Sequence, residues 1–208
     1  MTPRLRAAIA AGVLGAGLGF GGCGSTWRPP IFLAQDFSDG RIAPIAILPP
    51  VDARIDTSIE VELDEQLRGD AVKVLERRGY PAVLSAAGAD AGTVTLDELA
   101  SADAARIRAL GPPGARWVMI LGLVDVSTAL TFGSTGNAEV AGFLFDTERG
   151  VLLWRDKGVA QVGQGGLLGM ALVGAMDEAA IQTAVGHLLA SLPIQAVPPT
   201  PAAGAPPR

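Results

Sequence analysis

The chain has 208 residues, of which 49% are hydrophobic and 18% charged, and its formal net charge at pH 7 is −5. This acidic balance excludes nucleic acid as an expected partner, because binding phosphates needs a basic face. It also disfavours adhesion to anionic lipid by charge. Cys23 is the one cysteine, so no disulfide can form within the chain and hydrophobic packing must stabilise the fold.

Residues 1–22 have the pattern of a bacterial export signal peptide. Arg4 and Arg6 form a short positive region, residues 7–20 are apolar, and small residues lead into Cys23. A transmembrane anchor is excluded by length, because a spanning helix needs about 20 apolar residues. A thiol at the cleavage point predicts lipidation of Cys23 through a thioether, with acyl chains such as palmitate, rather than plain export with an unmodified thiol.

This segment resembles a bacterial lipoprotein signal, in which a residue of the Leu type, a small residue, and Gly or Ala precede the cysteine. Gly22 fits that box, whereas Phe20 and Gly21 are less usual. In such lipoproteins an Asp directly after the cysteine tends to mean retention at the inner membrane. Gly24 therefore implies the outer membrane, with the domain facing the periplasm and membrane lipid binding through acylated Cys23.

The rest of the chain divides into three parts. Residues 23–41 are expected to be the lipidated cysteine and a tether, because they contain few periodic apolar positions. Residues 42–192 have the size of a single domain. Residues 193–208 form a tail rich in Pro and Ala, which is not expected to fold.

Within the domain, apolar patterning predicts eight elements in chain order. Apolar residues at three-to-four spacing predict a helix over 59–78 that is ended by Gly79. Thr95 and Glu98 have the spacing of a capping box at the start of a second helix. The expected strands are 42–48, 80–84, 117–126, 139–146 and 151–162, with a tight turn at 147–150, and the expected helices are 59–78, 95–110 and 177–192.

The order β-α-β-α-β-β-β-α predicts an α+β fold, an α/β sandwich in which helices pack on a mixed sheet. No enzyme is expected. His187 is the one histidine, and its apolar neighbours on the last helix favour a position at the edge of the core over a catalytic base. The sequence predicts no metal site and no cofactor, and the glycines at 163–166 lack the Lys and Ser/Thr of a phosphate-binding loop.

The unusual feature of the mature domain is the apolar, glycine-rich stretch 165–176. One interpretation is a helix whose small residues let it approach the sheet closely. The other is a surface that binds a partner or touches a membrane, which would be exposed and apolar. The residues proposed for such an interface are Leu167, Leu168, Met170, Leu172 and Val173.

Four short segments of the chain, in this order, resemble a known family: residues 45–50, 76–80, 150–154 and 165–169. With these segments, residues 45–192 resemble a family of small outer-membrane lipoproteins of unknown function, first noticed in surveys of surface antigens. That family looks like the amino-terminal domain of the Tol translocation protein, of the curli-secretion lipoprotein and of lipoprotein activators of peptidoglycan synthases. The resemblance implies a sheet used as a docking scaffold in the cell envelope, and it transfers no catalytic residue.

Three functions follow as hypotheses. The first is a lipid-anchored, non-enzymatic component or assembly factor of an envelope transport or secretion complex, which docks to envelope proteins or to itself. The second is a regulatory lipoprotein that activates a peptidoglycan synthase. The third is an envelope glycan hydrolase, which would need a pocket with perturbed carboxylates.

Overall fold

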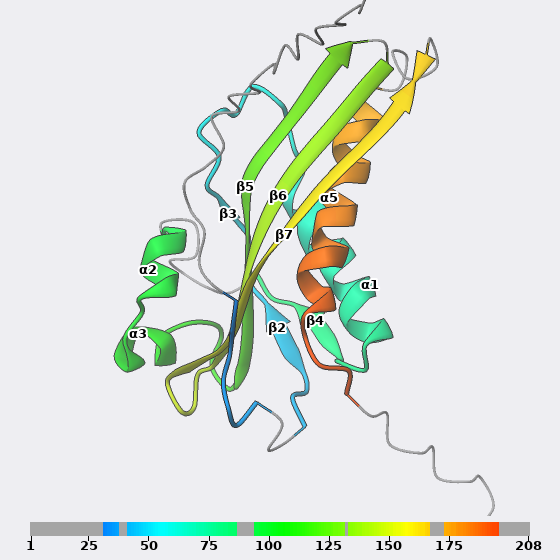
Figure 1. Cartoon of the computed structure of the whole chain (residues 1–208). Coiled ribbons are helices and arrows are strands. Elements are labelled where there is room, and N and C mark those ends of the chain that lie inside the picture. Colours follow the sequence, from blue (N-terminus) through cyan, green and yellow to red (C-terminus); the bar gives the residue numbers. More distant parts are fainter. Residues whose placement is uncertain (1–30, 38–40, 87–93, 132, 167–172, 196–208) are drawn as a thin grey trace, which may run out of the picture.

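The computed structural model describes residues 31–37, 41–86, 94–131, 133–166 and 173–195. They form one mixed seven-stranded sheet with helices on both faces (Figure 1). The α+β fold expected from the sequence is confirmed. The strands are β1 (Phe32–Leu33), β2 (Ile45–Ile47), β3 (Val51–Asp52), β4 (Ala82–Leu84), β5 (Trp117–Thr131), β6 (Gly133–Asp146) and β7 (Val151–Gly165), and the helices are η1 (Asp64–Gly69), α1 (Asp70–Arg77), α2 (Leu96–Ala100), α3 (Ala104–Arg108) and α5 (Val173–Ala190).

The sheet has the order β1-β7-β6-β5-β2-β4. Its centre is the antiparallel meander β5–β6–β7, in which the tight turn expected at 147–150 joins β6 to β7, and β1 pairs antiparallel with β7. The short strands β2 and β3 follow one another along the other side of β5, both parallel to it, and β4 lies parallel to β2 at the edge. The sequence patterns did not identify β1 or β3, which have two residues each.

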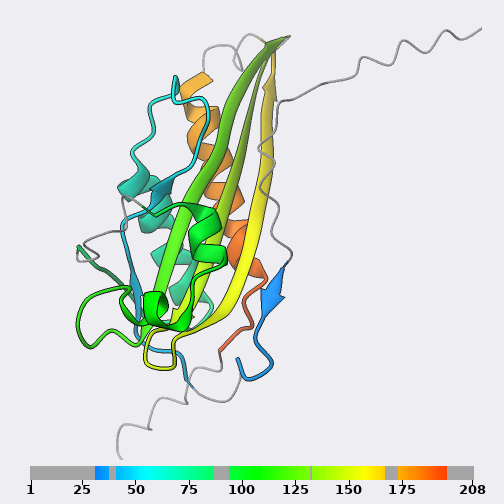
Figure 2. The ribbon, with the colours of Figure 1, turned by 90° about the vertical axis from the view of Figure 1, so that its left-hand side faces the viewer.

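Two apolar layers cover the two faces of the sheet. Helices α1 and α5 lie on one face, and α2 and α3 lie on the other, as Figures 1 and 2 show from two directions. The first layer holds Leu75 of α1 and Leu188 of α5, and the second holds Leu99 of α2 and Ile107 of α3. Alternate residues of the central strands therefore belong to different layers, as the period of two along a strand requires.

The helix expected over 59–78 is observed from Asp64 to Arg77, as the π-helical η1 followed directly by α1. Gly79 ends it, as the sequence predicts, with a φ of 87°. The N–H of Tyr80 donates to the carbonyl oxygen of Leu75 at 2.9 Å. The N–H of Gly79 donates to the carbonyl oxygen of Glu76 at 3.0 Å. These are the two bonds of a Schellman motif, which returns the chain to the sheet as β4.

The helix expected over 95–110 is observed as α2 and α3. Its capping box is confirmed, because the Thr95 N–H donates to the Glu98 carboxylate at 2.9 Å and the Glu98 N–H donates to Thr95 Oγ1 at 3.2 Å. The helix is interrupted between Ala100 and Ala104. The carboxylate of Asp103 accepts a hydrogen bond of 2.8 Å from the Arg106 N–H and caps α3. A capping side chain of this kind competes with continuation of the preceding helix.

The central strands are longer than the apolar pattern indicates. β5 and β6 stay paired as far as Thr131 and Gly133, so the ladder extends beyond the strands expected over 117–126 and 139–146. Apart from Leu130, the described residues in this part of the ladder are small or polar and give little strand signal. Backbone hydrogen bonds to both neighbours hold β6 in place there.

α5 lies close against β6 and β7 because glycines on the strands leave room for it. A Cβ on Gly158 would collide with the carbonyl oxygen of Ala184, and one on Gly136 would collide with that of Met176. A Cβ on Gly142 would lie 3.0 Å from a methyl carbon of Leu188. The close approach of helix and sheet therefore depends on small residues in the strands.

Part of the stretch expected to be a tether belongs to the domain. β1 pairs with Trp154 and Arg155 of β7, and Phe37 is buried in the layer beneath α5. Residues 24–30 are then all that separates Cys23 from the first described residue. At the other end, the described domain continues past Leu192 to Gln195. No helix within the described ranges is long and apolar enough to span a membrane.

Candidate functional site

The edge strand β4 exposes apolar side chains. Val83 is 50% exposed and Leu84 is 55% exposed, and no strand among the described residues pairs with the outer side of β4. Sheet edges are usually protected by charged residues or by cover, and the residues of β4 carry no charge. An edge of this kind can accept an extended segment of another chain as an additional strand.

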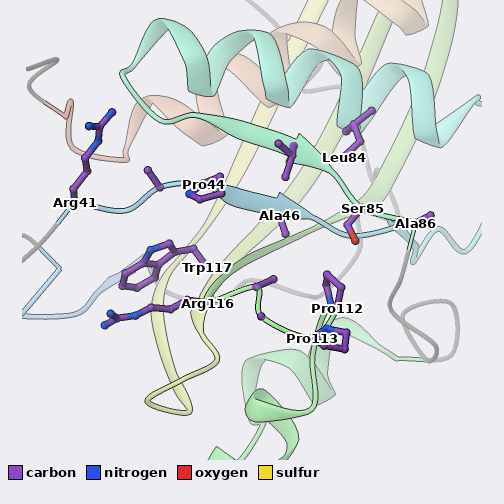
Figure 3. Close-up of a pocket in the computed structure, with 14 residues that line it drawn as sticks. Arg41, Pro44, Ala46, Leu84, Ser85, Ala86, Pro112, Pro113, Arg116 and Trp117 are labelled. Atoms are coloured by element: carbon purple, nitrogen blue, oxygen red, sulfur yellow. The ribbon is translucent and has the colours of Figure 1, made fainter. Parts of the chain in front are cut away.

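A hollow of about 700 Å³ lies beside β4 (Figure 3). Ala46 of β2 pairs with Val83 of β4 and alternates with Ile45 and Ile47, which pack beneath α1. Ala46 and Val83 therefore face the side of the sheet that α2 and α3 cover. The hollow is lined by Arg41, Ala43, Pro44, Ala46, Val83, Leu84, Ser85, Ala86, Pro112, Pro113, Gly114, Ala115, Arg116 and Trp117.

The loop between α3 and β5 forms one wall of the hollow and is held firmly. Pro112 and Pro113 have fixed φ angles, and Gly114 has a φ of 84°, which favours glycine. The hydroxyl of Thr147 donates to the carbonyl oxygen of Ala115 at 2.7 Å, which ties the loop to the β6–β7 turn. The wall is thus formed before any ligand arrives.

Arg116 and Trp117 close one end of the hollow, with Ser85 and Ala86 toward the other (Figure 3). The Arg116 guanidinium lies 4.3 Å from the centre of the Trp117 ring, a cation–π contact. It also pairs with the fully buried carboxylate of Asp146 at 3.0 Å and with Glu148 at 3.2 Å. The hydrogen bond that Arg116 donates to Asp146 holds the pKa of Arg116 above its ordinary value. The two ion pairs hold this cation in place.

Arg41 stands at the rim of the same hollow. It is exposed, and it makes no ion pair with any residue that the structure describes. It also lines a second, smaller hollow of about 250 Å³, where Asp36 pairs with Arg149. The hydrogen bond from Arg149 lowers the pKa of Asp36, so the Asp36 carboxylate stays ionised and its charge is balanced by Arg149. Arg41 remains available to a polar or anionic group of a ligand.

Arg68 of η1 fixes the position of β4 from the opposite face. Its guanidinium donates to the carbonyl oxygen of Ile47 at 3.0 Å and to that of Ser85 at 2.7 Å. The side chain is buried, and Asp64 pairs with it at 2.8 Å. One cation thereby joins the carboxyl ends of β2 and β4, which keeps the edge strand and the hollow in register.

Arginines and apolar residues dominate the lining of this site. The charged residues in its lining are arginines, which stay protonated at neutral pH and cannot exchange a proton with a substrate. The described ranges contain no cluster of three or more His, Cys, Asp and Glu residues that could hold a metal ion. Apolar walls, an aromatic ring and guanidinium donors suit an extended peptide, whose carbonyl oxygens need donors.

The structure does not bring the sequence-predicted interface into view. Leu167, Leu168, Met170 and Leu172 lie outside the described residues, as does Cys23, and Val173 is the first residue of α5. The interface proposed for these residues therefore stays a prediction.

His187 joins α5 to β7. Its Nδ1 lies 2.8 Å from the carbonyl oxygen of Val159, so a protonated Nδ1 donates a hydrogen bond there. The contact agrees with the position at the edge of the core that the sequence favours.

The sequence analysis did not predict the hollow. Its lining comes from three separated stretches, residues 41–46, 83–86 and 112–117, and only the fold places them together. Pro112 and Pro113 come soon after the helix expected over 95–110. No spacing rule connects them with Arg41 or Trp117, so no sequence signal could have identified the site.

No protein-family model matches the chain, and no curated protein matches its sequence. Its fold is similar to those of several solved structures. The PelC dodecamer from Paraburkholderia phytofirmans has 13% identity and a TM-score of 0.44, over 74% of this chain and 90% of that one. The lipoprotein GNA1162 from Neisseria meningitidis has 19% identity and a TM-score of 0.42, over 66% and 98%.

A third similar structure is the hypothetical protein CT253 from Chlamydia trachomatis, with 14% identity and a TM-score of 0.40, over 70% of this chain and 88% of that one. At these identities and TM-scores the likenesses assign no function to the chain.

Proposed function

We propose that this chain is a lipoprotein of the bacterial outer membrane, anchored by acylated Cys23, and that it acts without catalysis as a docking component of an envelope transport or secretion complex. The observation that carries the proposal is the exposed apolar edge strand β4 beside a preformed hollow. Val83 and Leu84 are the apolar side chains at that edge. A partner that adds an extended segment there would pair with the free backbone N–H and C=O groups of the edge and cover both side chains.

The length of the spacer supports a position close to the membrane. Because β1 belongs to the domain, residues 24–30 separate the lipidated cysteine from it, and they span at most roughly 25 Å when fully extended. A regulator that reaches through the peptidoglycan to a synthase would need a longer tether. The docking role at the membrane surface is therefore preferred to the synthase regulator.

The carboxylates offer little support to a glycan hydrolase. Such an enzyme needs a carboxylic acid whose pKa is raised, so that it can donate a proton. The pKa values of Asp36 and Asp52 are lowered instead, in each case chiefly by a hydrogen bond from an arginine, Arg149 and Arg54 respectively. These aspartates are structural ion-pair partners.

The test of the docking role compares two valine substitutions on the lipidated, detergent-extracted protein from its own host. Val83→Asp places a charge on the edge beside the hollow. Val159→Asp places the same charge on β7, at a residue that is 55% exposed. We expect subunits of an envelope transport complex to be recovered with the wild type and with Val159→Asp, and to be lost with Val83→Asp.

A Cys23→Ser variant provides the control for the anchor. It should appear in the aqueous fraction after detergent phase separation, and mass spectrometry should find acyl groups on Cys23 of the wild type alone. Recovery of the same subunits with Val83→Asp would show that the edge strand is not the docking site. An unacylated Cys23 in the wild type would overturn the anchor.

A further inference from the structure

The last described residues of the chain are held by hydrogen bonds to Arg78, Tyr80 and Ile42. The hydroxyl of Tyr80 donates to the carbonyl oxygen of Pro193 at 2.5 Å, and the guanidinium of Arg78 donates to that of Ala190 at 2.9 Å. Gln195 makes two bonds, from its N–H to the carbonyl oxygen of Arg78 at 3.0 Å and from its side-chain amide to that of Ile42 at 3.1 Å. The path of the chain is therefore fixed as far as Gln195.

Gln195, the last described residue, is bonded to a segment that also contributes to the rim of the hollow. Arg41 and Ala43 both line the hollow, and they flank Ile42, to which Gln195 is bonded. The last described residue is therefore bonded to a residue whose two neighbours in the chain both line the site.

The residues that follow have a composition suited to the site. Residues 196–208 read AVPPTPAAGAPPR, with Pro198 and Pro201 in a Pro-x-x-Pro spacing. Such segments favour the polyproline II conformation, whose backbone carbonyl groups make no internal hydrogen bonds. They dock in grooves lined by aromatic and apolar side chains, and the low entropy of the preformed helix reduces the cost of binding.

We propose that the hollow beside β4 is the docking site for this chain's own proline-rich segment, residues 196–208. Trp117 and the loop prolines supply flat apolar walls, and Arg41 supplies guanidinium donors for the carbonyl oxygens of the segment. At roughly 3.1 Å per residue, residues 196–201 span about 19 Å, which is long enough to enter the hollow from Gln195. Because the segment is tethered, its effective concentration at the site is in the millimolar range.

Docking of the segment would cover Val83 in the absence of a partner. The consequence that a partner must displace residues 196–208 rests on the proposed function, whereas docking itself does not. The segment would then act as an internal competitor at the edge strand.

The experiment uses the chain from Gly24 to Arg208, expressed without its lipid and carrying a nitroxide spin label on Ala203→Cys. The readout is the loss of amide signals of nearby residues in a nuclear magnetic resonance spectrum. We expect signals of Val83 and Ala115 to be lost, and those near Val159 on the far part of the sheet to be kept. The signals should return when Pro198 and Pro201 are replaced by Ala, a change confined to the segment.

A mixing control distinguishes contact within one molecule from contact between two copies. In a mixture of isotope-labelled chains without the nitroxide and unlabelled chains with it, signals should be kept, because the contact is within one molecule. Equal losses in that mixture would assign the segment to a second copy and overturn the proposal, as would kept signals at Val83 and Ala115 in the spin-labelled chain. This measurement involves no partner, so its failure and failure of the recovery experiment on Val83→Asp are separate results.

Discussion

Gly158→Ala is the substitution whose effect follows most directly from the geometry. An added Cβ would collide with the carbonyl oxygen of Ala184 and would lie 2.7 Å from the backbone nitrogen and 2.8 Å from the Cβ of Leu188. These are atoms of the α5 backbone or directly attached to it, so no flexible side chain can move aside. α5 must shift away from β7, which loosens the packing of the fully buried Leu188.

The magnitude follows from measured costs of overpacking. Extra methyl groups in a packed core destabilise by about 1–3 kcal/mol, and contact with backbone favours the upper end, about 3 kcal/mol. For a domain of this size, 1 kcal/mol lowers the melting temperature by about 2–4 °C. Gly158→Ala should therefore melt roughly 6–12 °C below the wild type.

Gly186→Ala is the matched control. Gly186 lies in the same helix α5, and nothing lies within 4 Å of a Cβ added to it. Alanine should stabilise this helix position by about 0.5–1 kcal/mol. Thermal and urea unfolding of the two variants should thus change in opposite directions. A Gly158→Ala chain as stable as the wild type would refute the close contact between α5 and β7.

Three further predictions concern other contacts. Thr95→Ala removes the capping box of α2 and should lower the free energy of unfolding by about 1 kcal/mol in urea titrations. Arg68→Met leaves two carbonyl groups without their donor, so unfolding should become about 2 kcal/mol easier and hydrogen exchange at the Ser85 amide faster. The hydrogen bond from Arg54 lowers the pKa of Asp52 in the folded chain, so its stabilisation is present above the unfolded pKa, about 3.9, and is lost as the pH falls through the folded pKa. Asp52→Asn should be less stable than the wild type at pH 7, and the difference should disappear in unfolding experiments well below about pH 3.9.

The sequence predicted the elements whose burial is periodic. The helix that ends at Gly79 and the capping box at Thr95 are confirmed, because both depend on residues that are close in the chain. The far halves of β5 and β6 were missed because residues 127–138, apart from Leu130 and Phe132, are small or polar. Their place in the sheet follows from pairing with neighbours, which no local pattern reports.

The site was less predictable than the fold. Apolar character directed attention to residues 167–173, whereas the hollow depends on Arg41, Val83 and Trp117 from distant parts of the chain. Gly158 shows the same limit. It was read as part of a strand, and its contact with Ala184 becomes apparent only when the helix and the sheet are both in place.

The pairing of β1 with the first part of β7 determines how far the molecule can reach. Phe32 lies opposite Arg155, near the end of the sheet where Trp117 begins β5, and the β5–β6 hairpin lies at the other end. Fifteen residues of β5 at roughly 3.3 Å each give a rod of about 50 Å. Under the proposed lipid anchor at Cys23, the hairpin stands far above the bilayer while β4 stays near it, and one molecule then contacts structures at two different heights.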